Sequence, residues 1–209
     1  MTTSLVVKKT GFITGMSTRN MPYDTLENGL SQLVRTLGLA NHKVVRMNQT
    51  HSAHVQRIGI DNASVLEDTD GIWTTEPGIV VAVKTADCLP VLVMHPQLVG
   101  VVHAGREGTE LGIMKVFLDQ VRMALGIIDG FTFWFGPAIC RRCYQIDRDR
   151  DLYYDVVARN REQIGESLDL NRSEIVYSNK CTCCQNDQFF SYRKEGDNAG
   201  RLWTVGMRT

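Results

Sequence analysis

Short apolar runs rich in valine and isoleucine recur along this chain, and they constrain its fold more than any other feature. Runs of about four to eight such residues, bounded by polar segments, are typical of buried β-strands. We predict strands at residues 4–7, 43–47, 79–86, 90–95, 98–104, 131–135, 174–178 and 202–207. The chain is therefore expected to form β-sheet over much of its length.

Three segments are predicted to be helical, at residues 28–40, 109–126 and 151–168. In the first two, apolar side chains recur at the i, i+3, i+4 and i+7 spacing of an amphipathic helix. Gly38 and Gly126 are candidate stops at their ends, and Thr109 is a candidate N-cap. Many strands with about three helices indicate an α+β or α/β layered fold.

The bulk composition favours a single globular domain and argues against some classes of partner. The chain has 209 residues, of which 43% are hydrophobic, and it has no internal repeat or flexible linker. We therefore predict one domain spanning residues 1–209. Its 23 basic residues balance its 23 acidic ones, which gives no bulk argument for nucleic acid or an anionic membrane. No stretch resembles a transmembrane helix or a secretory signal, so we expect a cytoplasmic protein.

Three side chains that can bind a metal each lie within or beside an apolar stretch. They are His51 in MNQTHSAHV, Cys88 in VKTADCLPVLV and His103 in VGVVHAGREGT. Each falls at or near the end of a predicted strand, where a loop can lift a side chain into a pocket. A catalytic zinc site takes three protein ligands and leaves a fourth position open. The trio therefore predicts zinc, with copper as an alternative in the same site.

Each member of the trio also has a purely structural interpretation. A lone cysteine is usually a small buried hydrophobe, and a lone histidine is usually a hydrogen-bonded core residue. Asp87 next to Cys88 disfavours the thiolate, whereas a bound divalent cation deprotonates the thiol. We prefer His51 to His54 as a ligand because the polar run NQT places His51 in a turn, while His54 is expected at the surface.

A second group of cysteines combines CRRC, at Cys140 and Cys143, with CTCC, at Cys181, Cys183 and Cys184. A CxxC pair followed much later by a second pair can close a structural tetrahedral zinc site. The spacing of CTCC is not that of a clean zinc ribbon, so free thiols under loops are the alternative. A disulfide framework is not expected in a reducing compartment.

Several segments occur in a distinctive order, and the set is highly specific. They are GMSTR, NQTH, DTDGIWTTEPG, VKTADCLPVLV, VVHAGREGT, FWFGPAI with CYQI, and CTCCQNDQFFSYRKEGDNAGR. Together they span nearly the whole chain and resemble the multicopper polyphenol oxidase (laccase-domain) family, also described as the peptidoglycan editing factor or purine nucleoside phosphorylase family. The resemblance implies a single-domain layered α/β/β/α sandwich of the cysteine-hydrolase-like type. It also implies a zinc site at His51, Cys88 and His103.

Two segments depart from the family pattern. The family's HAGWRG is HAGREG here, so Arg106 stands in place of tryptophan and Glu107 in place of arginine. If that arginine holds phosphate, Glu107 is expected to repel it. The family's STRxGGVS is STRNMPYDT here, which keeps Arg19 but lacks both glycines. These changes bear on the choice of substrate more than on the metal site.

The resemblance implies zinc-dependent phosphorolysis of adenosine, inosine, guanosine or methylthioadenosine, with adenosine deamination as an associated activity. We assign catalysis to Cys88, His51, His103 and Asp87, the last in proton transfer. We assign substrate and phosphate binding to Arg19, Asn48, Gln49 and Arg106. The partners expected are a purine nucleoside and phosphate, with no nucleic acid and no membrane, for a monomer or small homo-oligomer.

Three further functions stay open at this point. A cysteine hydrolase or amidase that edits peptidoglycan precursors would use Cys88 as nucleophile and His103 as base. A copper-binding polyphenol oxidase is the second, but five histidines are too few for the clusters of a multicopper laccase. A catalytically decayed metal-binding module is the non-enzymatic possibility, supported by the altered HAGREG and STRNMP segments. The chain has no GxGxxG, Walker A, GxSxG or HExxH motif.

Overall fold

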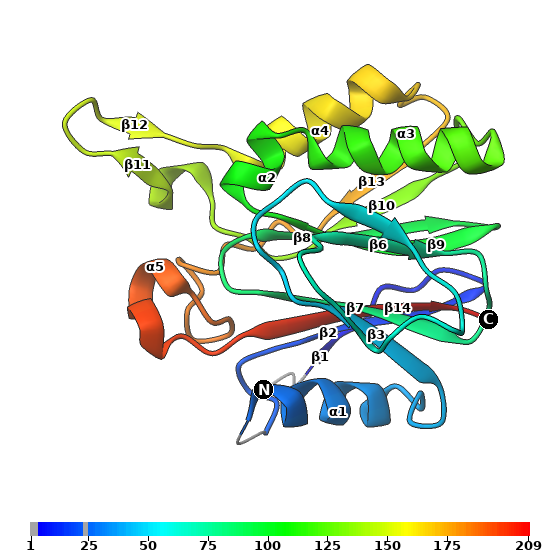
Figure 1. Cartoon of the computed structure of the whole chain (residues 1–209). Helices are drawn as coiled ribbons and strands as arrows, with labels where there is room; N and C mark the ends of the chain where they lie inside the picture. Colours follow the sequence, from blue (N-terminus) through cyan, green and yellow to red (C-terminus); the bar gives the residue numbers. More distant parts are fainter. Residues whose placement is uncertain (1–3, 23–24) are drawn as a thin grey trace.

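A computed structural model describes residues 4–22 and 25–209. Two six-stranded sheets lie face to face, and helices cover their outer faces, so the layers run α/β/β/α as predicted (Figure 1). The first sheet has the order β1 (Ser4–Leu5), β2 (Phe12–Ser17), β14 (Leu202–Arg208), β7 (Ile79–Thr85), β3 (Lys43–Met47) and β5 (Val65–Leu66). The second has the order β13 (Glu174–Tyr177), β10 (Thr132–Phe135), β8 (Leu89–His95), β9 (Leu98–Ala104), β6 (Gly71–Thr74) and β4 (Val55–Arg57). A separate hairpin pairs β11 (Gln145–Asp147) with β12 (Leu152–Tyr153).

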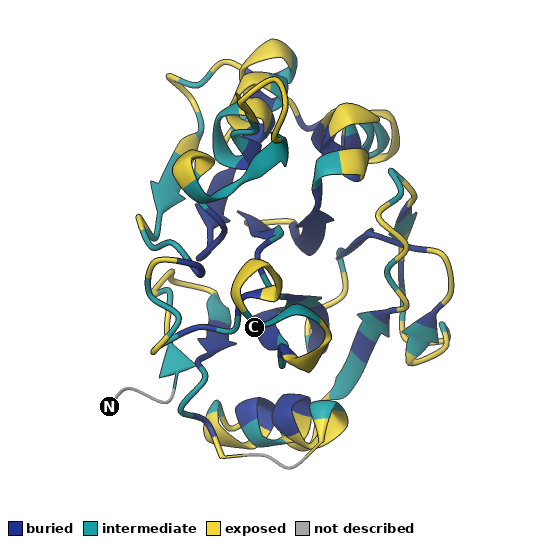
Figure 2. Cartoon of the chain, turned by 90° about the vertical axis from the view of Figure 1, so that its left-hand side faces the viewer, coloured by how far each residue is buried: buried dark blue, intermediate teal, exposed yellow. Residues whose placement is uncertain are grey.

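The helices turn one face to a sheet and the other to solvent (Figure 2). α1 (Leu26–Thr36) covers the first sheet, and α3 (Ile113–Leu125) and α4 (Val156–Ser167) cover the second. The short helices α2 (Arg106–Glu110) and α5 (Tyr192–Glu195) and the 3-10 turns Arg141–Cys143 and Gly196–Asn198 lie in the connections. Among the described residues, no helix combines the length and apolar character needed to cross a bilayer.

Apolar side chains fill the spaces between all four layers, which explains why the predicted strands are continuous apolar runs. In β7, Val80 packs with the α1 side and Val81 with the space between the sheets. In β8, Leu92 faces the space between the sheets and Val93 packs with the α3 side. Strands buried on both faces lose the alternation of polar and apolar residues. The central strands were therefore predictable from their hydrophobicity.

The predicted helix over residues 109–126 is wrong as a single element, because the structure has two helices, α2 and α3. Gly112 separates them with a φ of +81°, a left-handed conformation that ends the first helix. Thr109 is not an N-cap but a buried residue inside α2, where its Oγ1 accepts a hydrogen bond from Asn160 Nδ2 at 2.9 Å. Gly126, with a φ of +69°, ends α3 as predicted.

Several boundaries differ from the predicted ones by a few residues. The helix predicted over 151–168 begins only at Val156, because the Asp155 carboxylate caps it. α1 begins two residues before the predicted segment, capped by Thr25, and Gly38 with a φ of +73° follows its end. The strand predicted over 4–7 is confined to β1. The apolar pattern missed β2, β6, the short edge strands β4 and β5, and the hairpin of β11 and β12.

Two loops and the end of one strand meet at one edge of the two sheets. β3 and β7 run parallel, so the loops that follow them leave the first sheet at the same edge. The loop after β7 leads directly into β8, whose first residue, Leu89, pairs with Ala104 at the end of β9. The segments after β3 and β7, which carry His51 and Cys88, and the end of β9, which carries His103, are therefore brought together.

Candidate metal centre and its cavity

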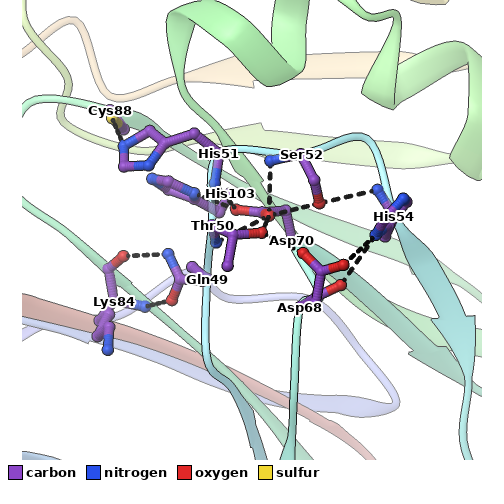
Figure 3. A network of polar contacts seen from close by, with 10 residues as sticks. All are labelled: Gln49, Thr50, His51, Ser52, His54, Asp68, Asp70, Lys84, Cys88 and His103. Atoms are coloured by element: carbon purple, nitrogen blue, oxygen red, sulfur yellow. Dashed lines mark hydrogen bonds and ion pairs between the residues drawn. The ribbon is translucent and has the colours of Figure 1, made fainter.

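A loop after β3 carries His51, and one buried carboxylate holds that loop in place. Asp70 accepts hydrogen bonds from the backbone N–H groups of Thr50 (3.1 Å), His51 (3.1 Å) and Ser52 (2.8 Å) (Figure 3). The Ser52 hydroxyl also donates to Asp70, at 2.8 Å. His51 has a φ of +64°, which is uncommon for a residue with a side chain. The bonds to Asp70 offset this backbone cost and fix the position of the His51 ring.

The same carboxylate orients His103, near the end of β9. Asp70 Oδ1 lies 2.7 Å from His103 Nδ1, and both side chains are buried. Burial alone raises the pKa of Asp70, but the hydrogen bonds from His103 and Ser52 hold that pKa well below the usual carboxyl range. Burial lowers the pKa of His103 despite the nearby carboxylate. The ring is therefore neutral, donates from Nδ1 to Asp70 and keeps Nε2 for a metal.

Cys88 lies in the turn between β7 and β8, close to both rings. Its Sγ is 3.8 Å from His51 Nε2, and one ligand atom from each of the three residues lies within 4.8 Å of the others (Figure 3). Burial raises the pKa of Cys88 to about 12, and the charges of Asp87 and Asp70 contribute to the shift. The thiol alone is therefore protonated, whereas a divalent cation between the three side chains would deprotonate it.

The neighbouring backbone leaves room for an ion at this point. A Cβ at Gly105 would lie 2.7 Å from His51 Cδ2 and 3.3 Å from Cys88 Sγ. Glycine at this position therefore allows the close approach of the trio. Two imidazoles and one thiolate are a donor set that fits zinc or copper. The predicted trio is thus assembled as a candidate metal centre.

The trio lines a cavity of about 870 Å³, a volume typical of small-molecule sites. Two tyrosines, Tyr144 and Tyr192, offer flat apolar surface. The charged residues on the cavity wall are Lys84, Arg106, Arg193 and Arg201, with Asp87 and Glu107 as the acidic members. The wall therefore carries an excess of positive charge and suits a ligand with an anionic part.

Comparison with known proteins identifies the family. The model of the family described as multi-copper polyphenol oxidoreductase laccase matches residues 11–163 and 148–209. The chain belongs to this family. Adenosine deaminase RL5, from an unknown prokaryotic organism, is 30% identical over 203 residues, which cover 82% of this chain and 78% of that protein.

A second relative is similar to this chain in both sequence and fold. The purine nucleoside phosphorylase YlmD of Geobacillus stearothermophilus is 29% identical over 217 residues, covering 87% of this chain and 78% of that protein. A crystal structure of YlmD from that organism superposes with a TM-score of 0.82 at 25% identity, over 95% of this chain and 92% of that chain. These matches confirm the resemblance found in the sequence and the layered fold that it implied.

Two of the substrate-binding residues predicted for this laccase-family chain lie on the cavity wall. Gln49 donates from Nε2 to the Lys84 carbonyl (2.8 Å) and accepts from the Lys84 N–H (3.0 Å), so it ties the His51 loop to β7. Arg106 opens α2 and pairs with Glu110 at 3.5 Å. Because HAGREG runs into a helix, the change of Arg106 and Glu107 relative to the family pattern rotates the guanidinium around the helix axis.

The remaining two predicted substrate-binding residues, Asn48 and Arg19, are not among those that line the cavity. Asn48 donates from Nδ2 to Glu67 at 2.7 Å. Arg19 pairs with Glu195 at 2.5 Å, and its guanidinium lies over the Phe190 ring, 4.4 Å from the centroid. The positions of both side chains are therefore explained by contacts within the protein, without a substrate.

Asp87 lines the cavity next to Cys88, but both of its carboxylate oxygens already accept hydrogen bonds. Thr182 Oγ1 donates to Oδ1 at 2.6 Å, and the Arg193 N–H donates to Oδ2 at 2.6 Å. Asp87 also has a φ of +89°, so these bonds secure an unusual backbone conformation beside Cys88. Its predicted role in proton transfer stays a prediction.

Sequence reasoning missed Asp70 and three of the basic residues on the wall, Lys84, Arg193 and Arg201. The signal for Asp70 was an acidic residue directly before the buried strand GIWT. Lys84 was visible as the single cation in the apolar run IVVAVK, and burial lowers its pKa, with the charges of Arg46 and Arg201 contributing. Arg193 and Arg201 lie in the FFSYRKEGDNAGR segment, and no local sequence pattern indicated that either would line the cavity.

Proposed function

We propose that the chain is a zinc-dependent purine nucleoside phosphorylase, which converts a purine nucleoside and phosphate into the free base and ribose 1-phosphate. One observation carries the proposal: the His51–Cys88–His103 trio lines the same cavity as four basic side chains. The relatives named purine nucleoside phosphorylase and adenosine deaminase support a purine nucleoside as the substrate.

The basic side chains account for the phosphate. Arginine binds phosphate oxygens through two parallel hydrogen bonds, and lysine adds a point charge. We assign this role to Arg106, Arg193, Arg201 and Lys84. In the reaction, a phosphate oxygen attacks C1′ of the ribose, and the bond from C1′ to the purine nitrogen breaks. The electron pair of that bond leaves on the base, which then takes up a proton.

Asp70 and Asp87, which lie beside the trio, are given supporting roles in the reaction. Zinc, when bound there, supplies Lewis-acid chemistry that polarises a substrate oxygen or lowers the pKa of a water. Burial keeps His103 neutral, and Asp70 orients its ring, as a metal ligand requires. Asp87, beside Cys88 on the wall, is our candidate for moving a proton to the departing base.

Adenosine deamination is the second candidate, supported by the relative named adenosine deaminase. In that reaction water adds to C6 of adenine, ammonia leaves, and inosine forms. Three protein ligands leave a fourth position for such a water.

A cysteine hydrolase and a multicopper oxidase have less support. The raised pKa of Cys88 disfavours the thiolate that a cysteine hydrolase would need as its nucleophile. Five histidines are too few to build the copper clusters of a multicopper oxidase.

Product analysis tests the proposal. Zinc-loaded protein is incubated with adenosine, with and without phosphate, and the products are identified by mass spectrometry. The proposal predicts adenine and ribose 1-phosphate only when phosphate is present, and no product from Cys88→Ala. Inosine formed with or without phosphate would contradict phosphorolysis and indicate deamination as the activity. No turnover with bound zinc would favour a decayed module.

The cytoplasmic location is part of the same proposal. None of the six cysteines forms a disulfide in the structure, and the cytoplasm keeps cysteines reduced. A monomer or a small homo-oligomer stays our prediction for the assembly.

A further inference from the structure

Four cysteines from two distant loops converge at a second point, outside the cavity trio. They belong to two CxxC pairs, Cys140 with Cys143 and Cys181 with Cys184. The Sγ atoms of all four lie within 4.8 Å of one another. Cys184 Sγ is 3.4 Å from Cys143 Sγ and 4.0 Å from Cys140 Sγ. The neighbouring Cys183 is buried and is not one of the four converging cysteines.

Backbone hydrogen bonds prepare this group to carry negative charge. The N–H groups of Cys140 (3.2 Å) and Cys184 (3.4 Å) both point to Cys181 Sγ. Donors aimed at a sulfur favour its thiolate form and orient it as a ligand. The two arginines of CRRC, Arg141 and Arg142, lie between Cys140 and Cys143 and add positive charge to the segment.

The chemistry of the group selects the ligand. Four thiolates at the corners of a small volume form the closed tetrahedral set of a structural zinc site, which leaves no position open for a substrate. Four such thiolates around one Zn²⁺ carry a net charge of −2, and nearby cations and N–H donors offset it. We propose that Cys140, Cys143, Cys181 and Cys184 bind one structural Zn²⁺, distinct from the metal of the cavity.

This zinc would hold the two loops that shape one wall of the cavity. Tyr144, which follows Cys143, lines the cavity. Thr182, which follows Cys181, donates to the Asp87 carboxylate, and the Ile139 N–H donates to the Asp87 carbonyl at 2.8 Å. A metal that joins the two loops therefore fixes the position of the residue next to Cys88. The inference itself does not depend on phosphorolysis, because a metal count is independent of turnover.

The first test counts metal in a chain whose cavity site is removed. The His51→Ala/Cys88→Ala variant, purified under reducing conditions, is expected to keep one zinc per chain in native mass spectrometry. X-ray absorption at the zinc edge is expected to show sulfur ligands alone, at about 2.3 Å. A metal-free variant, an iron in place of zinc, or nitrogen ligands would overturn the inference. An inactive wild-type protein that still holds this zinc would contradict only the proposed function.

The second test removes one ligand from each pair. Cys143→Ser/Cys184→Ser is expected to hold one zinc fewer than the wild type, while Cys183→Ala, the matched control from the same loop, keeps the wild-type count. An unchanged count in the double variant, or a disulfide among the four cysteines of the zinc-loaded wild type, would reject the site. If the double variant does not fold, the count in His51→Ala/Cys88→Ala decides.

Discussion

Asp70 and His103 form a buried pair, 2.7 Å from Oδ1 to Nδ1, and the same carboxylate accepts the backbone N–H of His51. One side chain therefore sets the tautomer of one candidate ligand and the backbone position of another. Carboxylate–histidine–metal arrangements of this kind tune both the orientation and the basicity of the ligand. The candidate metal centre thus depends on a residue that is not itself one of its ligands.

Replacing this carboxylate is expected to weaken metal binding. Asp70→Asn keeps the shape of the side chain but loses the charge, and the affinity for zinc is expected to fall by about 10–100-fold. Competition with a chromophoric chelator measures the change. Asp61→Asn is the control, because Asp61 is an exposed aspartate outside this network. Equal affinities in wild type and Asp70→Asn would contradict the role given to Asp70.

Glu195 is expected to make stability depend on pH. Burial raises the pKa of Glu195, but the hydrogen bonds from Arg19 and Ser191 outweigh burial and lower it. Such a group stabilises the fold above its unfolded pKa of about 4.3 and loses that contribution as the pH falls through its folded pKa. Glu195→Gln is therefore expected to cost about 1–2 kcal/mol at neutral pH and progressively less below about pH 4. Thermal unfolding across pH measures this, with the more exposed Glu174→Gln as control.

Two neighbouring residues of α2 are expected to act on phosphate in opposite directions. Arg106→Ala removes a cation from the wall and is expected to raise KM for phosphate about tenfold or more. Glu107→Gln removes a repelling charge and is expected to lower it, by about two- to fivefold. Steady-state kinetics with varied phosphate give both values. If KM for phosphate changed in the same direction in both variants, phosphate would not bind at this part of the cavity.

The metal is expected to control the reactivity of Cys88. In metal-free protein the pKa of about 12, raised by burial and by the charges of Asp87 and Asp70, keeps the thiol protonated. Alkylation of Cys88 at neutral pH is therefore expected to be slow, and to become faster as the pH rises towards that pKa. Peptide mapping by mass spectrometry resolves Cys88 from the remaining cysteines. Fast alkylation near pH 7 would instead favour a cysteine hydrolase.

The sequence predicted the parts of the fold that hydrophobicity alone determines. β7, β8 and β9 are predominantly apolar because they are buried on both faces, and they appear close to where they were expected. The break between α2 and α3 was missed because Gly112 interrupts the backbone without interrupting the apolar stripe. The spacing of apolar residues along a helix does not indicate the φ angle of any one residue.

The trio was predictable because each candidate ligand lies at or near the end of a predicted strand. The residue that supports the trio, Asp70, was not predictable in this way. Asp70 lies 33 residues before His103 in the sequence and shares no local pattern with it. The second CxxC pair was obscured by Cys183, which stands next to Cys184 and makes the motif look irregular. Only the fold separates the cysteine that packs in the core from the two that join Cys140 and Cys143.

The most direct test of the account measures ribose 1-phosphate formed from adenosine and phosphate by zinc-loaded wild type, His51→Ala and His54→Ala. His51 belongs to the trio, while His54 is an exposed histidine on the same loop, paired with Asp68. The account predicts phosphate-dependent product from the wild type and from His54→Ala, and a loss of both bound cavity zinc and product in His51→Ala. Undiminished ribose 1-phosphate formation by His51→Ala would contradict it.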